Sequence, residues 1–551
     1  MPPATRIAFV LACAAAWTAG CRREAPPDSA AQAGPGADSS APPLYDNLGT
    51  HHHAITANAE AQRYFDQGLR LTYAFNHEEA ISSFREGARR DPNCAMCWWG
   101  VALALGPNIN IPMDTTAVAP ALDAMRRARV AADHATPWER DYIAALATRY
   151  DSGQGADRAR LDSAYASAMR DLARRYPDDL DAQTLYAEAL MDLQPWNYYT
   201  VGGAPKGAIL EITRVLEGVI ARGPNHPGAC HYYIHAVEAS PSPERALPCA
   251  ERLAGLMPGA GHLVHMPAHV YVRVGRYADA ADHNEHALHA DQELLERRHL
   301  AGLYPHVYVI HNWHFLWFTR TMLGQYEPAV AAAKEVTAGV PLEAVRAFPP
   351  LEVFPPTVYF TMARFGRWDA LLREPAPPAE LRYTTAVWHY TRGLAFAAQG
   401  RRAQAQVARD SLAAIAAALP ADFMANINSG KSLLAIADRH LRAVLALEPR
   451  RRAAAVQLLR EAAAIEDSLT YDEPPAWYWP MRQVLGQVLL KSGDPKGAER
   501  AFREDLERNR ENGWALTGLA ASLRAQGKVA EANRVAERLE RAWPRAVTGQ
   551  L

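Results

Sequence analysis

Hydrophobic and small residues recur along most of the chain at spacings that fit pairs of packed helices. In the first pair these positions are Tyr64, Gly68, Leu71, Ala80, Phe84 and Pro92. The small residues let two helices approach closely, and the aromatic residues fill the groove between them. Asp91-Pro92 is expected to end the second helix, because proline cannot continue it. Alanine, arginine and leucine abound while β-branched runs are few, so the pattern predicts a nearly all-α chain.

The same pattern recurs at the C-terminal end. One set is Gly486, Gly493, Ala498 and Phe502, and the next set, 34 residues on, is Leu516, Gly527, Ala532 and Pro544. A period of 34 residues is typical of a helix–turn–helix repeat. On these residues the chain resembles the tetratricopeptide repeat (TPR) family. The resemblance implies an all-α solenoid of helical hairpins, in which the first helix of each hairpin lines a concave groove.

Composition adds two limits to this picture. The chain has 551 residues, of which 49% are hydrophobic, so it can bury a large core but is too long for one compact domain. We therefore expect two arrays of hairpins, residues 58–330 and 331–551. The net charge is −2, and no basic run or aromatic-basic platform occurs, so nucleic acid is not an expected partner.

The first 20 residues are expected to form a signal peptide. Arg6 supplies a positive charge, and the apolar stretch 7–17 is too short to span a bilayer. The following Thr18-Ala19-Gly20-Cys21 resembles the lipobox of bacterial lipoproteins, which implies a lipid on Cys21. Thr18 departs from the usual leucine, so cleavage without lipidation is the alternative. No aspartate follows Cys21, and by this resemblance the protein is expected on the periplasmic side of the outer membrane.

Residues 21–57 are expected to be a disordered tether with a histidine-rich end. The stretch 24–43 is rich in Ala, Pro, Gly and Ser and cannot bury a core. At its end, His51, His52 and His53 can fold over the groove as a lid or act as extra ligands.

Four cysteines remain in an oxidising compartment once Cys13 and Cys21 are set aside. Cys230 and Cys249 are expected on the two helices of one hairpin, where a disulfide can join them. Cys94 and Cys97 form a C-x-x-C pair, for which a disulfide or two buried thiols is expected. Metal ligation or redox chemistry at this pair is the weaker alternative, because no βαβ pattern surrounds it.

Histidines repeat at the same period as the hairpins. His231 and His235 are four residues apart, and His265 and His269 repeat this pair 34 residues later. In the TPR register, set from glycine and alanine positions, seven histidines occupy groove-facing slots of first helices: His231, His235, His262, His265, His269, His311 and His314. Residues three or four apart share one helix face, and neighbouring helices lie roughly 8–10 Å apart. Imidazole is a ligand for Zn, Cu or Fe, so the pattern predicts a transition-metal site in the groove.

Three acidic residues occupy slots near these histidines. Glu188, Asp192 and Glu238 can supply an oxygen ligand or fix the tautomer of an imidazole.

Two other functions fit the same pattern. A metal-free groove can bind a protein or peptide partner, as TPR grooves commonly do. A metal-dependent enzyme, an oxidase or a hydrolase, can use the same histidines, with Glu188 or Glu238 as its base. The familiar H-E-x-x-H helix is absent, because Tyr232 stands where its glutamate would be.

Overall fold

The computed structural model of the protein describes residues 42–151, 157–298 and 304–543. The expected signal peptide, Cys21 and the first part of the expected tether lie outside these residues. The chain divides into two compact units. Unit 1 comprises Met1–Val270 and His286–Pro305, and unit 2 comprises Tyr271–Glu285 and His306–Leu551.

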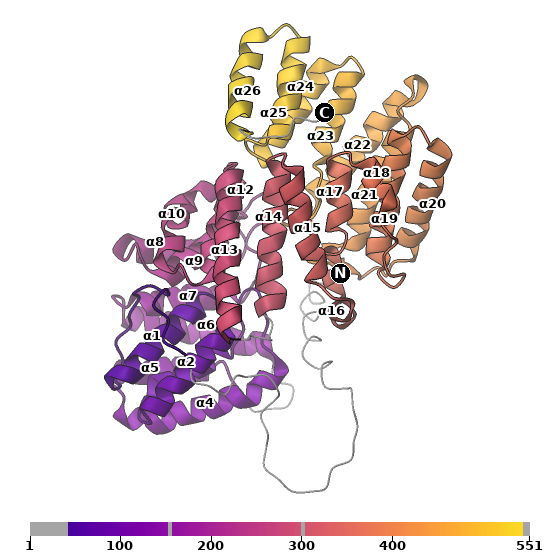
Figure 1. Ribbon diagram of the computed structural model, residues 1–551. Coiled ribbons are helices and arrows are strands. Elements are labelled where there is room, and N and C mark those ends of the chain that lie inside the picture. Colours follow the sequence, from indigo (N-terminus) through magenta and orange to yellow (C-terminus); the bar gives the residue numbers. More distant parts are fainter. Residues whose placement is uncertain (1–41, 152–156, 299–303, 544–551) are drawn as a thin grey trace, which may run out of the picture. The chain divides into compact units, whose positions relative to one another are not determined.

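Unit 1 is built from helices and short helical turns (Figure 1). Its elements are α1 (Ala59–Tyr73), α2 (His77–Arg90), α3 (Ala95–Ala104), η2 (Thr115–Ala117), α4 (Val118–Ala131), η3 (Ala132–His134), α5 (Pro137–Ala147), α6 (Arg158–Arg175), α7 (Leu180–Met191), α8 (Ile209–Arg222), α9 (Pro227–Val237), η4 (Pro243–Ala246), α10 (Leu247–Leu256) and α11 (Gly261–His265). Both α12 (Pro267–Val274) and α13 (Tyr277–Arg298) contribute residues to each unit, and η5 (Pro305–Val309) follows them.

Unit 2 repeats the helical pattern. Its helices are α14 (Ile310–Met322), α15 (Tyr326–Ala338), α16 (Leu342–Ala347), η6 (Pro349–Val353), α17 (Thr357–Arg364), α18 (Trp368–Arg373), α19 (Arg382–Ala398), α20 (Arg402–Ala418), α21 (Gly430–Leu445), η7 (Pro449–Arg451), α22 (Arg452–Asp467), α23 (Met481–Lys491), α24 (Pro495–Arg508), α25 (Gly513–Ala525) and α26 (Val529–Ala542). Two short antiparallel strands, β1 (Met424–Ala425) and β2 (Asn428–Ser429), are the only strands in the described residues.

Each unit packs its hairpins around the same glycine–phenylalanine contact. In unit 1, a Cβ atom added to Gly68 or Gly100 would come within 2.6 Å of the Phe84 ring. In unit 2, a Cβ added to Gly486 or Gly518 would meet Phe502 at a similar distance. A side chain at these glycines would therefore push α1 and α3 off α2, or α23 and α25 off α24.

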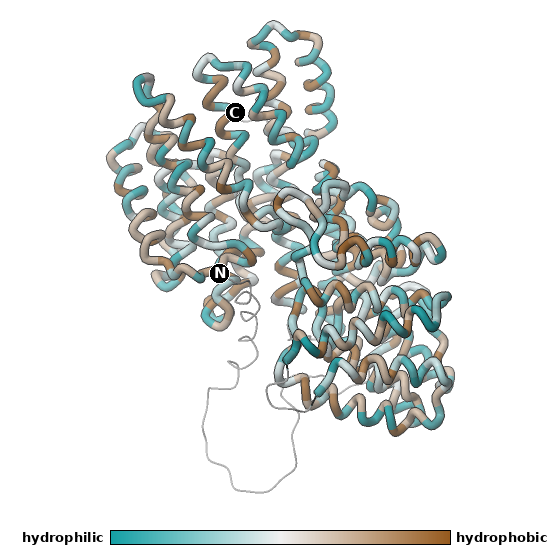
Figure 2. The backbone as a smooth tube through the Cα atoms, turned by 180° about the vertical axis from the view of Figure 1, so that it is seen from behind, coloured by the Kyte–Doolittle hydropathy of each residue, from teal (hydrophilic) through white to brown (hydrophobic). Residues whose placement is uncertain are grey.

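These packed hairpins confirm the all-α fold of TPR type that the sequence predicts. Consecutive helices such as α1, α2 and α3, or α23, α24, α25 and α26, pack against one another in chain order. Hydrophobic and hydrophilic residues alternate along the helices, as expected for helices with one buried face (Figure 2). The division between units falls near residue 305 and not after residue 330, and the stretch 271–285 belongs with the C-terminal part.

Residues 42–57 pack against the helices of unit 1, whereas the sequence predicted a disordered tether up to residue 57. Leu48 is buried, the Tyr45 hydroxyl donates to Glu79 at 2.8 Å, and the Gly259 amide donates to the Asn47 carbonyl at 2.8 Å. The composition of this segment indicated a flexible chain, but these contacts hold residues 42–57 on the helices of unit 1.

The four cysteines form two disulfides. Cys94 caps the start of α3 and pairs with Cys97, and Cys230 of α9 pairs with Cys249 of α10. In the part of the chain that the structure describes, no helix combines the length and the apolar character that crossing a membrane requires.

Candidate metal centre

Five histidines of unit 1, from three helices, are buried together. His231 and His235 come from α9, His262 and His265 from α11, and His269 from α12. Their side chains are between 0% and 2% exposed. The register predicted that these residues share a face, but it placed them on an open groove, and the structure encloses them.

The close approach of α9 to the end of α1 positions the first histidine. Gly228 permits this approach, because a Cβ there would lie 2.4 Å from the Tyr73 ring. Nδ1 of His231 consequently reaches the Tyr73 carbonyl oxygen at 2.6 Å. A carbonyl only accepts, so Nδ1 carries the proton and Nε2 keeps its lone pair in the neutral ring. That Nε2 lies 3.1 Å from Nε2 of His262.

Glu238 fixes two further rings in the same tautomer. Its Oε1 accepts from Nδ1 of His235 at 2.9 Å, and its Oε2 accepts from Nδ1 of His269 at 2.5 Å. Burial alone would raise the pKa of Glu238, but the two histidines lower it to about 2, so the carboxylate is ionised. Nε2 of His235 is buried and has no hydrogen-bond partner.

The side chains of His231, His235 and His262, here called the first group, meet the distance requirement of a shared ion. His231, His235 and His262 each offer one ligand atom, and these atoms lie within 4.8 Å of one another. With metal–nitrogen bonds of about 2.0–2.1 Å, two ligands of a tetrahedral ion are about 3.3 Å apart. The 3.1 Å separation of His231 and His262 is close to this value.

The charge state of these rings also suits metal ligation. Burial, followed by the nearby His235, lowers the pKa of His231 well below its usual value. Burial likewise lowers the pKa of His235, although the charge of Glu238 opposes this shift. Neutral imidazole is the form that binds metals.

Two aromatic residues in unusual backbone conformations cover the histidines. Phe75 has φ 55° and Trp196 has φ 60°, in the left-handed region that residues other than glycine rarely adopt. The Phe75 ring centroid lies 4.5 Å from that of His231 and 5.5 Å from that of His262. Trp196 lies edge-on to His235 at 5.3 Å. The histidine register contained no signal for Phe75.

Among the remaining histidine candidates, His311 and His314 belong to α14 of unit 2. His314 is stacked on Trp317 with centroids 5.0 Å apart, and Phe354 meets it edge-on. Burial lowers the pKa of His314 to about 3. His314 therefore occupies an aromatic environment within unit 2, and no set of three potential ligands among the described residues includes it.

Two of the three acidic candidates serve a different interaction. Asp192 accepts a hydrogen bond from Arg149, which is 1% exposed. Burial raises the pKa of Glu188 and of Asp192, and the two carboxyls raise that of Asp192 further through their mutual repulsion. Of the three acidic candidates, Glu238 is thus the one that hydrogen-bonds these histidines, whereas Asp192 and Glu188 interact with Arg149.

The histidines expected to form a lid surround a second acidic residue. His51 Nε2 and His53 Nδ1 each donate to the Asp181 carboxylate at 2.9 Å, and the Tyr73 hydroxyl donates to it at 2.5 Å. His226 Nε2 lies 3.2 Å from the same carboxylate. His52 instead pairs with Asp66. Asp181 is the second residue of its repeat, counted from Leu180, as His262 is when counted from Gly261, so the register could have drawn attention to it.

His226, beside Asp181, differs from His231 and His235 in the ring nitrogen that carries the proton. Nδ1 of His226 accepts the Ala229 amide hydrogen bond at 3.2 Å, so the proton of the neutral ring sits on Nε2. A protonated Nε2 donates to a carboxylate, so His226 serves Asp181 as a hydrogen-bond donor. Asp181 is therefore a hydrogen-bonded carboxylate, and His231, His235 and His262 remain the candidate metal ligands.

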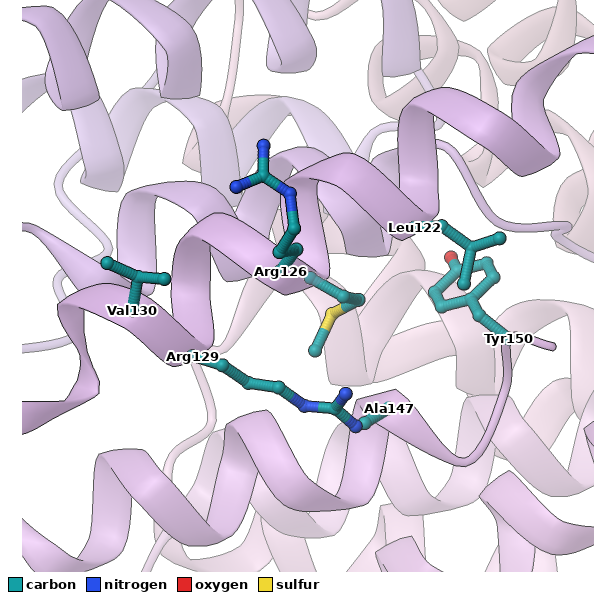
Figure 3. Close-up of a pocket in the computed structure, with 7 residues that line it drawn as sticks. Leu122, Arg126, Arg129, Val130, Ala147 and Tyr150 are labelled. Atoms are coloured by element: carbon teal, nitrogen blue, oxygen red, sulfur yellow. The ribbon is translucent and has the colours of Figure 1, made fainter. Parts of the chain in front are cut away.

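A surface pocket of about 300 Å³ lies elsewhere in unit 1 (Figure 3). It is lined by residues of α4 together with Ala147 and Tyr150, and two arginines, Arg126 and Arg129, extend from α4 beside it. Its lining contains no histidine, cysteine or carboxylate, so it offers no usual metal ligand.

Comparison with known proteins gives only distant likenesses. No family model matches the chain, and no curated protein matches its sequence. Among solved structures, the human IFIT1 dimer with m7Gppp-AAAA matches at 12% identity and a TM-score of 0.32, over 88% of this chain and 90% of that one. Yeast Tom70 matches at 11% identity and a TM-score of 0.28, over 88% and 92% of the two chains. The P58(IPK) TPR domain matches at 11% identity and a TM-score of 0.21, over 85% and 99%. Superpositions this loose add nothing to the fold read from the helices themselves.

Proposed function

We propose that this protein is a metal-binding protein of TPR type, in which unit 1 holds a transition-metal ion through Nε2 of His231, His235 and His262. The observation that carries the proposal is the pattern of Nδ1 hydrogen bonds. The Tyr73 carbonyl and the Glu238 carboxylate each bind an Nδ1–H group, which leaves Nε2 of His231 and His235 as lone-pair donors. Metal-ligating histidines are typically held in this way by a carbonyl or carboxylate.

Burial supports the metal over a peptide at this position. Rings that are at most 2% exposed cannot line a surface on which a peptide rests. The unpartnered Nε2 of His235 would cost free energy in a dry interior, whereas an ion would use its lone pair. Three imidazoles are the protein ligands of an open zinc site, which keeps a further position for water or a small ligand, and they equally suit Cu or Fe.

Metal content before and after substitution tests the proposal. Full-length protein, purified without a tag and loaded with Zn²⁺, is expected to retain at least one ion per chain through gel filtration. The double variant His231→Gln/His235→Gln is expected to lose one ion, because glutamine keeps much of the volume but not the imidazole nitrogen. Elemental analysis gives the ion count, and circular dichroism reports whether the variant is folded.

His314→Gln is the matched control in unit 2. This buried histidine lies against Trp317 and Phe354, so its replacement is expected to leave the ion count unchanged. The proposal would be refuted by wild-type protein that takes up no ion on titration, or by a folded double variant that retains the wild-type ion count.

A further inference from the structure

His265 and His269 form a second pair of facing imidazoles beside the proposed ion. Their Nε2 atoms are 2.8 Å apart, and the two side chains are 0% and 1% exposed. Neither residue belongs to the set formed by His231, His235 and His262, whose ligand atoms lie within 4.8 Å of one another. One ion cannot collect all five rings in this arrangement.

We propose that His265 and His269 bind a second transition-metal ion, so that unit 1 contains a two-metal centre. This inference rests on the proposed function, because the second ion lies next to the first. The ring centroids of His262 and His265 are 6.0 Å apart, and those of His235 and His269 are 5.5 Å apart. Each ring of the second pair is thus adjacent to a ligand of the first ion.

Glu238 orients one ring of the pair His265 and His269, as it orients one ring of the group His231, His235 and His262. Its Oε2 accepts from Nδ1 of His269, while its Oε1 accepts from Nδ1 of His235. One buried carboxylate therefore orients a ligand of each ion. A buried carboxylate beside both groups also offsets part of the positive charge that two neighbouring ions bring into the interior.

The spacing of the second pair indicates a preference in ion geometry. With bonds of about 2.0–2.1 Å, two nitrogens 2.8 Å apart subtend an angle of about 85–90° at the ion. Such an angle belongs to neighbouring ligands in a square-planar or octahedral complex, which Cu²⁺ and Ni²⁺ favour. Solvent or a small ligand would fill the positions that the two histidines leave open.

Counting ions per chain separates this inference from the proposed function. Metal-free full-length protein is titrated with Cu²⁺ and passed through gel filtration before elemental analysis. Two ions are expected for the wild-type chain and one for His265→Gln, whereas His289→Gln on the exposed face of α13 is expected to keep two. One ion in both the wild-type chain and His265→Gln would overturn the second site and leave the first. No ion in the wild-type chain would overturn both.

Electron paramagnetic resonance gives a second readout that needs no variant. At one equivalent of Cu²⁺ the wild-type protein is expected to show the spectrum of an isolated ion. At two equivalents the spectrum is expected to broaden or lose intensity, because adjacent Cu²⁺ ions couple magnetically. A spectrum at two equivalents that is the sum of two isolated ions would contradict a two-metal centre.

Discussion

Glu238 is the residue on which the orientation of both histidine groups depends. Its two oxygens hold Nδ1–H groups of His235 and His269, and its side chain is 1% exposed. In Glu238→Gln, the amide can accept from one imidazole but presents N–H to the other, so one ring loses its acceptor. We predict that this substitution weakens metal affinity about 10–100-fold, measured by competition with a chelator of known affinity.

Glu217→Gln is the matched control for this prediction. Glu217 also belongs to unit 1, but it is exposed and pairs with Arg245 and the Tyr233 hydroxyl. Its substitution is expected to leave metal affinity unchanged. Wild-type affinity in Glu238→Gln would show that the Nδ1 hydrogen bonds do not prepare these rings for an ion.

Phe75 links backbone strain to the enclosure of the histidines. A left-handed conformation costs a residue with a side chain roughly 1–2 kcal/mol, and such strain tends to gather at functional sites. Phe75→Gly relieves that cost but removes the ring that covers His231 and His262. We predict at least about tenfold faster transfer of the bound ion to a chelator, equivalent to about 1.4 kcal/mol.

The corresponding substitution in unit 2 distinguishes strain from enclosure. Glu511 has φ 52°, so Glu511→Gly relieves similar strain without touching a histidine of unit 1. Its ion-release rate is expected to match that of the wild-type chain. Equal acceleration in both variants would mean that the Phe75 ring does not retain the ion.

At this scale the sequence indicated five histidines that come together, but it also included His314, which packs against Trp317 and Phe354, and it did not indicate what surrounds the five. Repeat register brought His231, His235, His262, His265 and His269 to one place, because spacing along a helix sets a shared face. Arg149 could not be connected to Asp192 in the same way. That contact depends on how the chain after α5 packs against α7, and spacing within one helix carries no information on it.

At the scale of the structural elements, ionised side chains contribute to holding the segment 42–57 against the helices of unit 1. Burial alone would lower the pKa of His53, but its hydrogen bond to Asp181 and the charges of Asp179 and Asp66 raise it above the usual value. The pKa of Asp181 is well below its usual value; burial opposes this shift, and hydrogen bonds from His226, His51 and His53 outweigh it. The segment is therefore held in part by the ion pair between His53, in its protonated form, and the ionised Asp181.

The sign of the pH dependence follows from the raised pKa of His53. Its contribution to stability is fully present below about pH 6.5 and is lost as the pH rises through the higher pKa of the folded state. We predict that amides held by this segment, such as Gly259, exchange hydrogen faster at pH 8.5 than at pH 6 after correction for the intrinsic rate. Asp181 stays ionised over this range, so it does not reverse the trend.

His53→Gln isolates this effect. The variant is expected to lose the pH dependence of exchange, whereas His289→Gln on the surface of α13 is expected to retain it. A wild-type segment with equal protection at pH 6 and pH 8.5 would contradict the role given to His53. The sequence could not predict this attachment, because a Pro- and Ser-rich composition says nothing about the distant Asp181.

Across the whole molecule, periodicity predicted the fold class better than the division into units. Phe84 and Phe502 mark the same packing in both units, and their glycine neighbours lie 16 residues away on either side in the sequence. A solenoid continues from hairpin to hairpin without a linker of distinct composition, so composition did not mark the boundary near residue 305.

This division also determines where bound metal should stabilise the protein. An ion that binds only the folded state adds RT ln(1 + [L]/Kd), about 2.7 kcal/mol at one hundred times Kd. The proposed ligands all lie in unit 1, so saturating Zn²⁺ is predicted to protect amides of α1, α7, α9 and α11 in hydrogen-exchange mass spectrometry. Helices α19 to α26 of unit 2 provide the internal reference and are expected to exchange as in the metal-free chain. The His231→Gln/His235→Gln variant should lose most of the protection in unit 1. Protection that instead appears in unit 2, or that persists in this variant, would place the ion away from the α9 histidines.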